Sequence, residues 1–495
     1  MKLFQLLPEG SYEVAYGEDQ EIRSLMINSK IPSERAVFFA AKGKSIDGAD
    51  YIGEAKRNGA VAVVLERRRA SYYIPGVTYL VANSIAGAQS EMAIRLYDAN
   101  SPMPVKAAVT GTNGKTSFVM IASELFNRMG KRSAFTGTLG TNVPGFSGEL
   151  TDNTTFPPAL YAKILHECRK GGFHYIFSEA SSQGIAMGRV RGFAFDYAVF
   201  MNLTEDHLDY HKSMEEYYQA KKSLFAQSKK GIVNISDPFG RRLFRELKDE
   251  GREVVSFASG SDADYVLDGV RRAGSATEFS LRSRAFSDRF CVPMIGAHNA
   301  LNASLAIALA AEEGMPIGEA KTAASDLPPV RGRLERIETG RRSVYIDYAH
   351  TPDALEKSIA ALREATDGAL TIVFGCGGDR EREKRPQMGR IAAEKCDLAV
   401  ITTDNPRSEN PNAILSEIVG GIGAASENYL VIPQRQKAIE YAIQATEGGS
   451  VLIAGKGHEE YMVVGSKKIP FSDRACARDA VSKLEFGKKR SLGPL

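Results

Sequence analysis

A glycine-rich segment that ends in lysine and threonine is the strongest sign of chemistry in the sequence. Residues 105–116 read VKAAVTGTNGKT, an apolar stretch that runs through a glycine-rich turn into a helical pattern. Backbone N–H groups in such a turn point toward a phosphate, and the start of the helix adds positive potential. Lys115 would neutralise the terminal phosphates, and Thr116 would bind Mg²⁺. The segment predicts a nucleotide site, although Val109 stands where the usual spacing has glycine.

Two polar clusters follow apolar segments further along the chain. Glu179 lies in SEASS, directly after the apolar residues 175–177, and His207 lies in NLTEDHLDYH, after residues 197–201. The carboxyl ends of strands in an open α/β sheet are where ligands bind. A carboxylate and an imidazole at that edge are suited to a Mg²⁺ or phosphate site. A lone histidine is as often a surface or core residue, so this role depends on the rest of the chain.

The composition is that of a multidomain globular protein. The 495 residues are 43% hydrophobic and 25% charged, and the chain is about three times as long as one typical domain. Residues 1–14 lack the apolar core of a signal peptide, and no apolar run approaches the roughly 18 residues that span a bilayer. We therefore expect no membrane insertion.

The cysteines and the charged residues indicate which cellular compartment and which classes of partner to expect. The five cysteines are scattered without a CxxC pair, which argues against a disulfide framework and a zinc site and favours a reducing cytoplasm. The net charge is only +3, and no basic face with aromatic platforms is evident in a chain without tryptophan. We expect small-molecule substrates, no nucleic acid, and a monomer.

Alternating apolar and helical segments predict an α/β fold in three domains. The first domain, residues 1–102, has short apolar runs such as residues 60–65. In residues 103–332, strands alternate with helices, which indicates a largely parallel sheet behind the phosphate loop. The same rhythm restarts in residues 333–495, for example in the helical stretch 352–365, and predicts a second, Rossmann-like unit. NSPMP and LPP mark the two joints.

The order and spacing of several motifs resemble those of the Mur ligase family over essentially the whole chain. GTNGKT is followed by SEASS at 178–182, RVRG at 189–192, NLTEDHLDYH at 202–211 and YYQAKKSLF at 217–225. The resemblance implies an ATP-dependent and Mg²⁺-dependent amide ligase. Its N-terminal domain would bind the uridine nucleotide of UDP-MurNAc, its central domain ATP, and its C-terminal domain the incoming amino acid.

The same resemblance assigns residues to ATP and Mg²⁺. In the family, the lysine that matches Lys221 is carbamylated and helps to hold Mg²⁺, whereas the structural alternative is a lysine on a helix surface. The expected ATP-binding residues are Gly111, Thr112, Asn113, Gly114, Lys115, Thr116, Ser117, Asn299, Arg333 and Asp347. The expected metal ligands are Thr116, Glu179, His207 and Lys221, and the expected catalytic residues are Lys115, Glu179, His207 and Lys221.

Motifs in the last third resemble those of the family member that adds the third residue of the stem peptide. These are FGCGGDR at 374–380, DNPR at 404–407 and GKGHE at 455–459. In that group DNPR accompanies meso-diaminopimelate, whose distal carboxylate an arginine can bind with two parallel hydrogen bonds. An Asx turn with a solvated arginine is the structural alternative. The residues expected to contact diaminopimelate are Arg380, Asp404, Asn405, Pro406, Arg407, Gly455 and Glu459.

The acceptor side matches the family less closely. The residues that match its UDP-MurNAc-dipeptide site are Ser29, Asn153, Thr154, Thr155, Ser181 and Arg189. Asn28, Lys30 and Gln183 replace the usual aspartate, arginine and histidine. A specialised paralogue that joins another amino acid or acceptor is therefore an alternative.

A nucleotide site alone does not distinguish kinases, switches, motors and ligases, so there are two further alternatives, of which the first is the nearest rival. A folylpolyglutamate-type or secondary-metabolite ligase would share the chemistry, but folylpolyglutamate enzymes generally lack the first domain. A nucleotide-dependent switch would not need an amino-acid pocket. We favour the ligase of peptidoglycan precursor synthesis, in which ATP converts the D-Glu carboxylate into an acyl phosphate that the diaminopimelate amine attacks.

Overall fold

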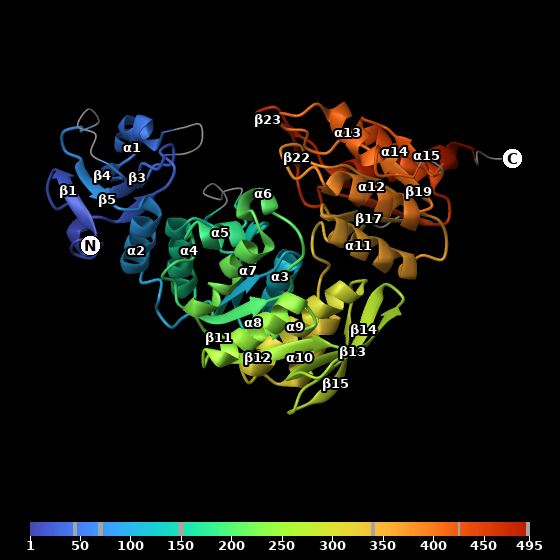
Figure 1. The fold of residues 1–495 in the computed structure, drawn as a ribbon, viewed down its shortest axis with the longest axis horizontal. Coiled ribbons are helices and arrows are strands. Elements are labelled where there is room, and N and C mark those ends of the chain that lie inside the picture. The colour runs from blue at the N-terminus through green and yellow to red at the C-terminus, as the bar shows by residue number, and fades with distance from the viewer. Residues whose placement is uncertain (43–46, 68–72, 147–152, 338–341, 424–425, 492–495) are drawn as a thin grey trace. The chain divides into compact units, whose positions relative to one another are not determined.

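The computed structural model describes most of the chain (Figure 1). The described residues are 1–42, 47–67, 73–146, 153–337, 342–423 and 426–491. They belong to two compact units. The first comprises Met1–Gly111, Ala122–Leu203 and Glu215–Ser256, and the second comprises Thr112–Ile121, Thr204–Met214 and Phe257–Leu495. In the described part of the chain, no helix has both the length and the apolar character needed to cross a membrane.

The N-terminal residues form a five-stranded sheet in the order β1-β5-β4-β3-β2. Its strands are β1 (Tyr12–Tyr16), β2 (Ser24–Met26), β3 (Ala36–Phe39), β4 (Ala60–Leu65) and β5 (Thr78–Ala82), and its helices are α1 (Ile52–Arg57) and α2 (Ile85–Tyr97). Only the β1–β5 pair is antiparallel among these strands. Strand β4 is almost wholly buried, as expected for a parallel strand whose two faces are both covered.

A ten-stranded sheet follows in the order β15-β14-β13-β12-β11-β10-β6-β9-β7-β8. Its strands are β6 (Val105–Thr110), β7 (Ser133–Gly137), β8 (Gly140–Thr141), β9 (Tyr175–Glu179), β10 (Phe195–Phe200), β11 (Ser228–Asn234), β12 (Glu253–Ser259), β13 (Tyr265–Ala273), β14 (Ala276–Arg282) and β15 (Ser287–Val292). Strand β6 lies between β9 and β10 and is parallel to both. The expected parallel arrangement is confirmed there, whereas β13, β14 and β15 form an antiparallel extension that the sequence rhythm did not predict.

The register of the three central strands brings their carboxyl ends together. Val109 pairs with Glu179 across β6 and β9, and Thr110 pairs with Phe200 across β6 and β10. The neighbouring helices are α3 (Lys115–Arg128), α4 (Pro158–Lys170), α5 (Ser182–Ala186), α6 (Leu208–His211), α7 (Met214–Lys222), α8 (Pro238–Asp249), α9 (Ala297–Glu312) and α10 (Ile317–Ser325). The polar clusters after β6, β9 and β10 therefore begin at one edge of the sheet.

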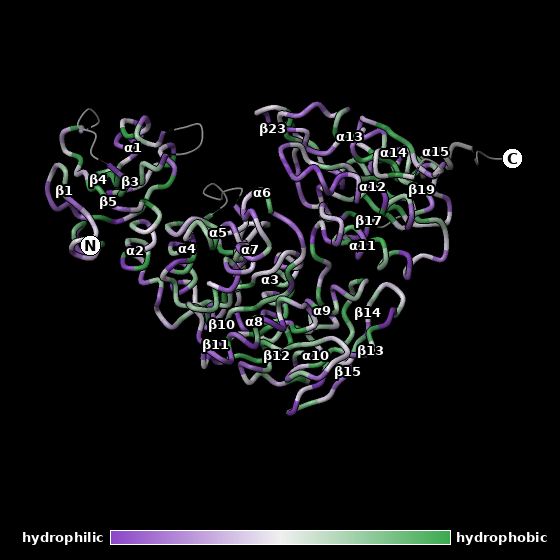
Figure 2. Tube along the Cα trace, in the orientation of Figure 1, coloured by the Kyte–Doolittle hydropathy of each residue, from purple (hydrophilic) through white to green (hydrophobic). Residues whose placement is uncertain are grey.

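The C-terminal residues form a six-stranded sheet in the order β16-β17-β21-β18-β19-β20. Its strands are β16 (Glu335–Ile337), β17 (Ser343–Asp347), β18 (Leu370–Phe374), β19 (Leu398–Ile401), β20 (Tyr429–Val431) and β21 (Ser450–Ala454), followed by the hairpin β22 (Tyr461–Val464) and β23 (Lys467–Pro470). The helices are α11 (Pro352–Ala365), α12 (Lys384–Lys395), α13 (Pro411–Val419), α14 (Arg435–Ala445) and α15 (Asp473–Ser491). Helices α11 to α13 cover one face and α14 and α15 the other, and Figure 2 shows hydrophobic stretches along the strands between them.

A buried ion pair joins α14 to the start of α15. Nε and Nη2 of Arg435 each lie 2.7 Å from an oxygen of Asp473, and both side chains are 0% exposed. We expect Asp473→Ala to lower the free energy of unfolding by about 3–5 kcal/mol, because it leaves a buried cation without its partner. Urea denaturation followed by circular dichroism would measure the loss.

The matched control for that substitution is Lys483→Ala, which removes an exposed ion pair with Glu440 on the same two helices. Exposed pairs contribute little, so this change should be much smaller. Equal losses for the two variants would contradict a stabilising role for the buried pair.

Candidate active site

The phosphate loop has the predicted strand, turn and helix. Strand β6 ends at Thr110, α3 begins at Lys115, and Gly114 between them has φ of +93°, a conformation that favours glycine. Nζ of Lys115 donates a hydrogen bond to the carbonyl of Thr112 at 3.1 Å. Thr116 is 4% exposed at the start of the helix. This arrangement fits a phosphate group, since the backbone amides at a helix start and a lysine converge there.

The segment that carries His207 is tied to this loop. Oγ1 of Thr112 donates to the carbonyl of Thr204 at 3.1 Å, and the amide of Thr204 donates back to the same hydroxyl at 3.0 Å. His207 itself has φ of +58°, and its Nε2 lies 3.5 Å from a carboxylate oxygen of Asp206. Burial raises the pKa of Asp206, but the nearby His207, His350 and Lys384 outweigh it and leave this pKa below its usual value.

Arg333, one of the predicted nucleotide residues, also contacts the phosphate loop. Nη2 of Arg333 donates to Oγ1 of Thr116 at 3.1 Å, and its guanidinium lies 4.5 Å from the ring centroid of Tyr348. Nδ2 of Asn113 donates to Asp353 at 2.8 Å. The structure thus places Arg333 at the loop, and it adds Asp353, which was not among the predicted nucleotide residues.

Two further predicted nucleotide residues are buried. Asn299 is 1% exposed in the first turn of α9, and its Nδ2 donates to the carbonyl of Ile295 at 2.9 Å. Its Oδ1 is a buried acceptor without a partner among the described residues, which fits an incoming donor such as an adenine amine. Asp347 accepts from the amides of Leu334 and Tyr348 at 3.3 and 2.8 Å, so in this structure it joins the segment that carries Arg333 to its own loop.

Glu179 and Lys221 are buried in the first unit. Glu179 is 3% exposed, and its carboxylate accepts from the amide and hydroxyl of Thr138 at 2.8 and 3.3 Å. A side chain on Gly137 would collide with this carboxylate. Lys221 is 1% exposed, with its Nζ 4.5 Å from the ring centroid of Tyr217, so the alternative of a surface lysine is wrong.

In the part of the chain that the structure describes, the side chains that could bind Mg²⁺ are separate oxygen donors and do not form a cluster of ligands. Among the described residues, no cluster of three or more His, Cys, Asp or Glu side chains is arranged to hold a metal ion. Mg²⁺ that is bound with a nucleotide takes only one or two protein oxygens, together with phosphates and water. Glu179 in the first unit offers a carboxylate of this kind, and Thr116 in the second unit offers a hydroxyl, so each has the oxygen chemistry that fits the ion.

A cavity of about 530 Å³ surrounds the predicted uridine site. Ser29 lines it, is 7% exposed, and donates its hydroxyl to the carboxylate of Glu54. Asn28 and Lys30 line the same cavity, and Oδ1 of Asn28 accepts from the amide of Lys30 at 3.0 Å. Lys163 of α4 adds a cation to the wall, which the sequence had not indicated.

Four of the predicted acceptor residues form one hydrogen-bonded group. Oγ1 of Thr155 lies 3.0 Å from Oγ of Ser181 and donates to the carbonyl of Glu179 at 3.1 Å. Nη1 of Arg189 donates to the carbonyl of Thr155 at 2.8 Å. Thr154 contacts Thr138, the residue that holds the Glu179 carboxylate, through hydroxyls 3.1 Å apart. Asn153 directly precedes this group and is partly buried.

The predicted amino-acid site is held together by a buried lysine. Nζ of Lys456 donates to Asn405 at 3.0 Å and to Glu459 at 2.7 Å, and Nδ2 of Asn405 donates to Glu459 at 2.9 Å. A side chain on Gly455 would approach the carboxylate of Asp404. Lys456 was not among the predicted residues, although it stands inside the GKGHE motif that pointed to its neighbours.

Two arginines at this site have no acidic partner. Nη1 of Arg407 donates to the carbonyl of Gly378 at 2.7 Å, and Nη1 of Arg380 donates to the carbonyl of Asp379 at 3.1 Å. Neither forms a salt bridge with a described carboxylate. Burial and the like charge of Arg380 lower the pKa of Arg407. Arg407 is half-buried, and the pair is suited to an external carboxylate.

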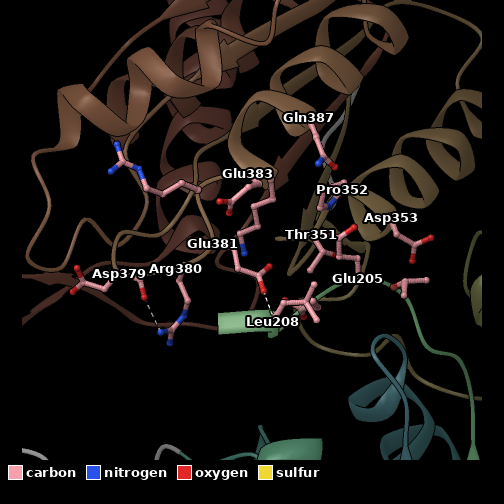
Figure 3. A pocket seen from close by; sticks show the side chains of 14 residues that line it. Glu205, Leu208, Thr351, Pro352, Asp353, Asp379, Arg380, Glu381, Glu383 and Gln387 are labelled. Atoms are coloured by element: carbon pink, nitrogen blue, oxygen red, sulfur yellow. Dashed lines mark hydrogen bonds between the residues drawn. The ribbon is translucent and has the colours of Figure 1, made fainter. Parts of the chain in front are cut away.

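A cavity of about 640 Å³ in the second unit borders Arg380 (Figure 3). Across it, the carboxylate of Glu381 accepts a hydrogen bond from the amide of Leu208 at 2.5 Å. Arg380, a predicted amino-acid ligand, lines this cavity, and so does Leu208, which directly follows the predicted metal ligand His207 in the sequence. Burial and the positive charge of Lys384 lower the pKa of His350 nearby to about 4, so this imidazole is neutral at pH 7.

Comparison with known proteins covers nearly the whole chain. Residues 21–96 match the catalytic domain of the Mur ligase family, residues 109–310 the Mur ligase middle domain, and residues 332–457 the Mur ligase glutamate ligase domain. The chain is 34% identical over 490 residues to UDP-N-acetylmuramoyl-L-alanyl-D-glutamate--2,6-diaminopimelate ligase 1 of Clostridium acetobutylicum, with 98% of this chain and 100% of that protein covered.

Solved structures show the same architecture. A UDP-N-acetylmuramoyl-L-alanyl-D-glutamate--2,6-diaminopimelate ligase matches with a TM-score of 0.66 and 28% identity over 98% of this chain and 99% of that one. The MurF ligase of Thermotoga maritima in complex with ADP matches with a TM-score of 0.67 at 19% identity, over 94% and 98% of the two chains, and shares the fold. With relatives this similar along both full lengths, the chain belongs to the Mur ligase family.

Proposed function

We propose that this chain is the ATP-dependent ligase that joins meso-2,6-diaminopimelate to the D-Glu carboxylate of UDP-MurNAc-L-Ala-D-Glu in peptidoglycan precursor synthesis. The observation that carries the proposal is the pair formed by Arg380 and Arg407, which has no acidic partner among the described residues. Diaminopimelate has a second carboxylate that lysine lacks, and an arginine pair can bind it. Glu459, which already accepts from Lys456, would face an ammonium group.

In this proposal the nucleotide residues act on the phosphates. ATP, when bound, supplies the phosphoryl group that activates the D-Glu carboxylate for attack by the amine. Lys115, the amides of residues 111–114 and Arg333 offset phosphate charge, while Asn299 and Asp347 orient the nucleotide. One or two Mg²⁺ ions would be held by Thr116, Glu179, His207 and a carbamylated Lys221, which share these ions with the phosphates and water. Glu179 and Lys221 are both buried, as groups that surround a bound ion would be.

The proposed domain limits follow the sequence joints. Residues 1–102 bind UDP-MurNAc through Ser29, residues 103–332 bind ATP, and residues 333–495 bind the amino acid. The acceptor's peptide and phosphates would contact Asn153, Thr154, Thr155, Ser181 and Arg189. The substrates are small molecules, and we propose that the enzyme is a cytoplasmic monomer.

The test is phosphate release with UDP-MurNAc-L-Ala-D-Glu and ATP while the amino acid is varied among meso-diaminopimelate, L-lysine and L-ornithine. We expect turnover with diaminopimelate and at least about 100-fold lower kcat/KM with the other two, because each leaves an arginine without a carboxylate. Equal use of lysine would contradict the role of the arginine pair.

The same assay addresses the alternative of a specialised paralogue. Asn28 and Lys30 line the cavity around Ser29, so these two residues would contact and recognise another nucleotide-sugar acceptor. ATP binding without turnover of any of the three amino acids would favour that alternative. In that case, acceptors with other sugars or peptides would be the next substrates to assay.

A further inference from the structure

The two loops that carry Arg380 and Arg407 are fixed against each other by their backbones. They follow β18 and β19, which are parallel neighbours in the six-stranded sheet. The amide of Gly378 donates to the carbonyl of Asn405 at 2.9 Å. A side chain on Gly378 would collide with the carbonyl of Pro406. The two loops therefore lie too close together for a side chain at Gly378. Their contact fixes the backbone from which each arginine side chain extends.

Glu409 lies two residues after Arg407 in the loop that follows β19. Both residues lie next to the loop that follows β18. A side-chain carbon placed on Gly378 would be 3.3 Å from Cβ of Glu409, and one placed on Gly377 would be 2.7 Å from Nη1 of Arg407. Glu409 and Arg407 thus flank the same two glycines. An acid in this position could neutralise the arginine pair and compete with a substrate carboxylate.

A buried arginine engages Glu409 instead. Arg385 on α12 is 0% exposed, and its Nη1 and Nη2 donate to the two oxygens of Glu409 at 2.9 and 2.8 Å. Glu409 also accepts from the amide of Asp379 at 2.5 Å. The hydrogen bond from Arg385 is the main reason that the pKa of Glu409 falls to about 2. The geometry is that of a bidentate arginine–carboxylate pair.

The other acids near the two loops are also engaged. Asp379 accepts from the hydroxyl of Ser408 at 2.6 Å, and Glu417 accepts from Arg385 at 2.7 Å. Glu459 accepts from Lys456 and Asn405. Asp379, Glu409, Glu417 and Glu459 therefore each have another partner among the described residues.

We propose that Arg385 is a positioning residue that keeps Glu409 away from the arginine pair, so that Arg380 and Arg407 remain available to a substrate carboxylate. The inference rests on the proposed function, since diaminopimelate supplies that carboxylate. Arg385 acts through Glu409 and does not itself touch the substrate. Its contribution is therefore expected in KM for the amino acid rather than in KM for ATP.

The test is a suppressor experiment. Arg385→Met should raise KM for meso-diaminopimelate about tenfold or more, because the released Glu409 carboxylate competes for the arginine pair. The double variant Arg385→Met with Glu409→Gln should bring KM back toward the wild-type value. The glutamine removes the competing charge, and its Oε1 can still accept from the amide of Asp379. KM for ATP should stay within about twofold throughout.

Two controls separate this role from loss of structure. Arg363→Met removes an arginine of α11 that pairs with Asp397, and it should leave KM for diaminopimelate unchanged. Arg385→Lys retains a cation beside Glu409, so its KM should stay close to wild type even where Arg385→Met reduces the yield of folded protein.

Each outcome decides the proposal. A double variant with a KM as high as that of Arg385→Met, or higher, overturns it in favour of simple packing. A large rise in Arg385→Lys that Glu409→Gln does not reverse overturns it as well. A wild-type enzyme that does not use diaminopimelate refutes the proposed function first, and the role of Arg385 toward that carboxylate falls with it.

Discussion

Replacing Arg407 with alanine is expected to lower kcat/KM for meso-diaminopimelate by about 100-fold or more, while KM for ATP changes little. A site built to bind a polar group loses both the charge-assisted hydrogen bonds and the counter-charge when the arginine is removed. Alanine tolerates the φ of +50° at this position about as well as arginine does, so the loop should keep its shape. Phosphate release with varied diaminopimelate and with varied ATP would measure both constants.

The control for this substitution is Arg390→Ala, which removes an exposed arginine from α12 in the same part of the fold. It should have the wild-type kcat/KM. Arg407→Lys should show an intermediate loss, because an ammonium group cannot form two parallel hydrogen bonds to a carboxylate. Equal losses toward diaminopimelate and ATP in Arg407→Ala would indicate a folding role instead.

Replacing Lys115 with alanine is expected to reduce kcat by at least about 1,000-fold, because the lysine at the start of α3 offsets charge on the transferring phosphoryl group. Its side chain donates a hydrogen bond to the nearby carbonyl of Thr112. We expect the Lys115→Ala protein to remain folded. Single-turnover phosphate release would measure kcat, and thermal unfolding would check the fold.

Lys131→Ala is the matched control, since Lys131 is an exposed lysine just beyond the other end of α3. It should retain full activity. An Lys115→Ala enzyme with the wild-type rate would exclude the loop at residues 111–116 as the site of phosphoryl transfer.

Regular elements were predicted well where the apolar pattern is continuous. The apolar run 60–65 and the helical stretch 352–365 coincide with β4 and α11. Strand β14 shows why the antiparallel extension was missed. Thr277, Phe279 and Leu281 are buried while the residues between them are more exposed. Such alternation is typical of an antiparallel strand with one solvated face, but it was interpreted as part of a parallel rhythm.

Short sequence motifs identified the candidate site residues, but the contacts between these residues could not be predicted from the sequence. GTNGKT and DNPR identify their own residues, because backbone geometry and charge within a short segment determine what they can bind. The hydrogen bond from Arg333 to Thr116 joins residues 217 positions apart, and the buried position of Lys221 depends on how α7 packs. Long-range packing of this kind leaves no local pattern in one sequence.

The close approach of the loops after β18 and β19 limits how this enzyme can acquire a new amino-acid preference. An inserted residue, or a side chain in place of Gly378, would push the two loops apart and disturb both arginines together. We therefore expect amino-acid preference to diverge by substitution of side chains on an unchanged backbone. Residue 407 is the position where a single substitution should change this preference most. Laboratory evolution toward lysine or ornithine should accordingly recover point substitutions at these loops and few insertions or deletions.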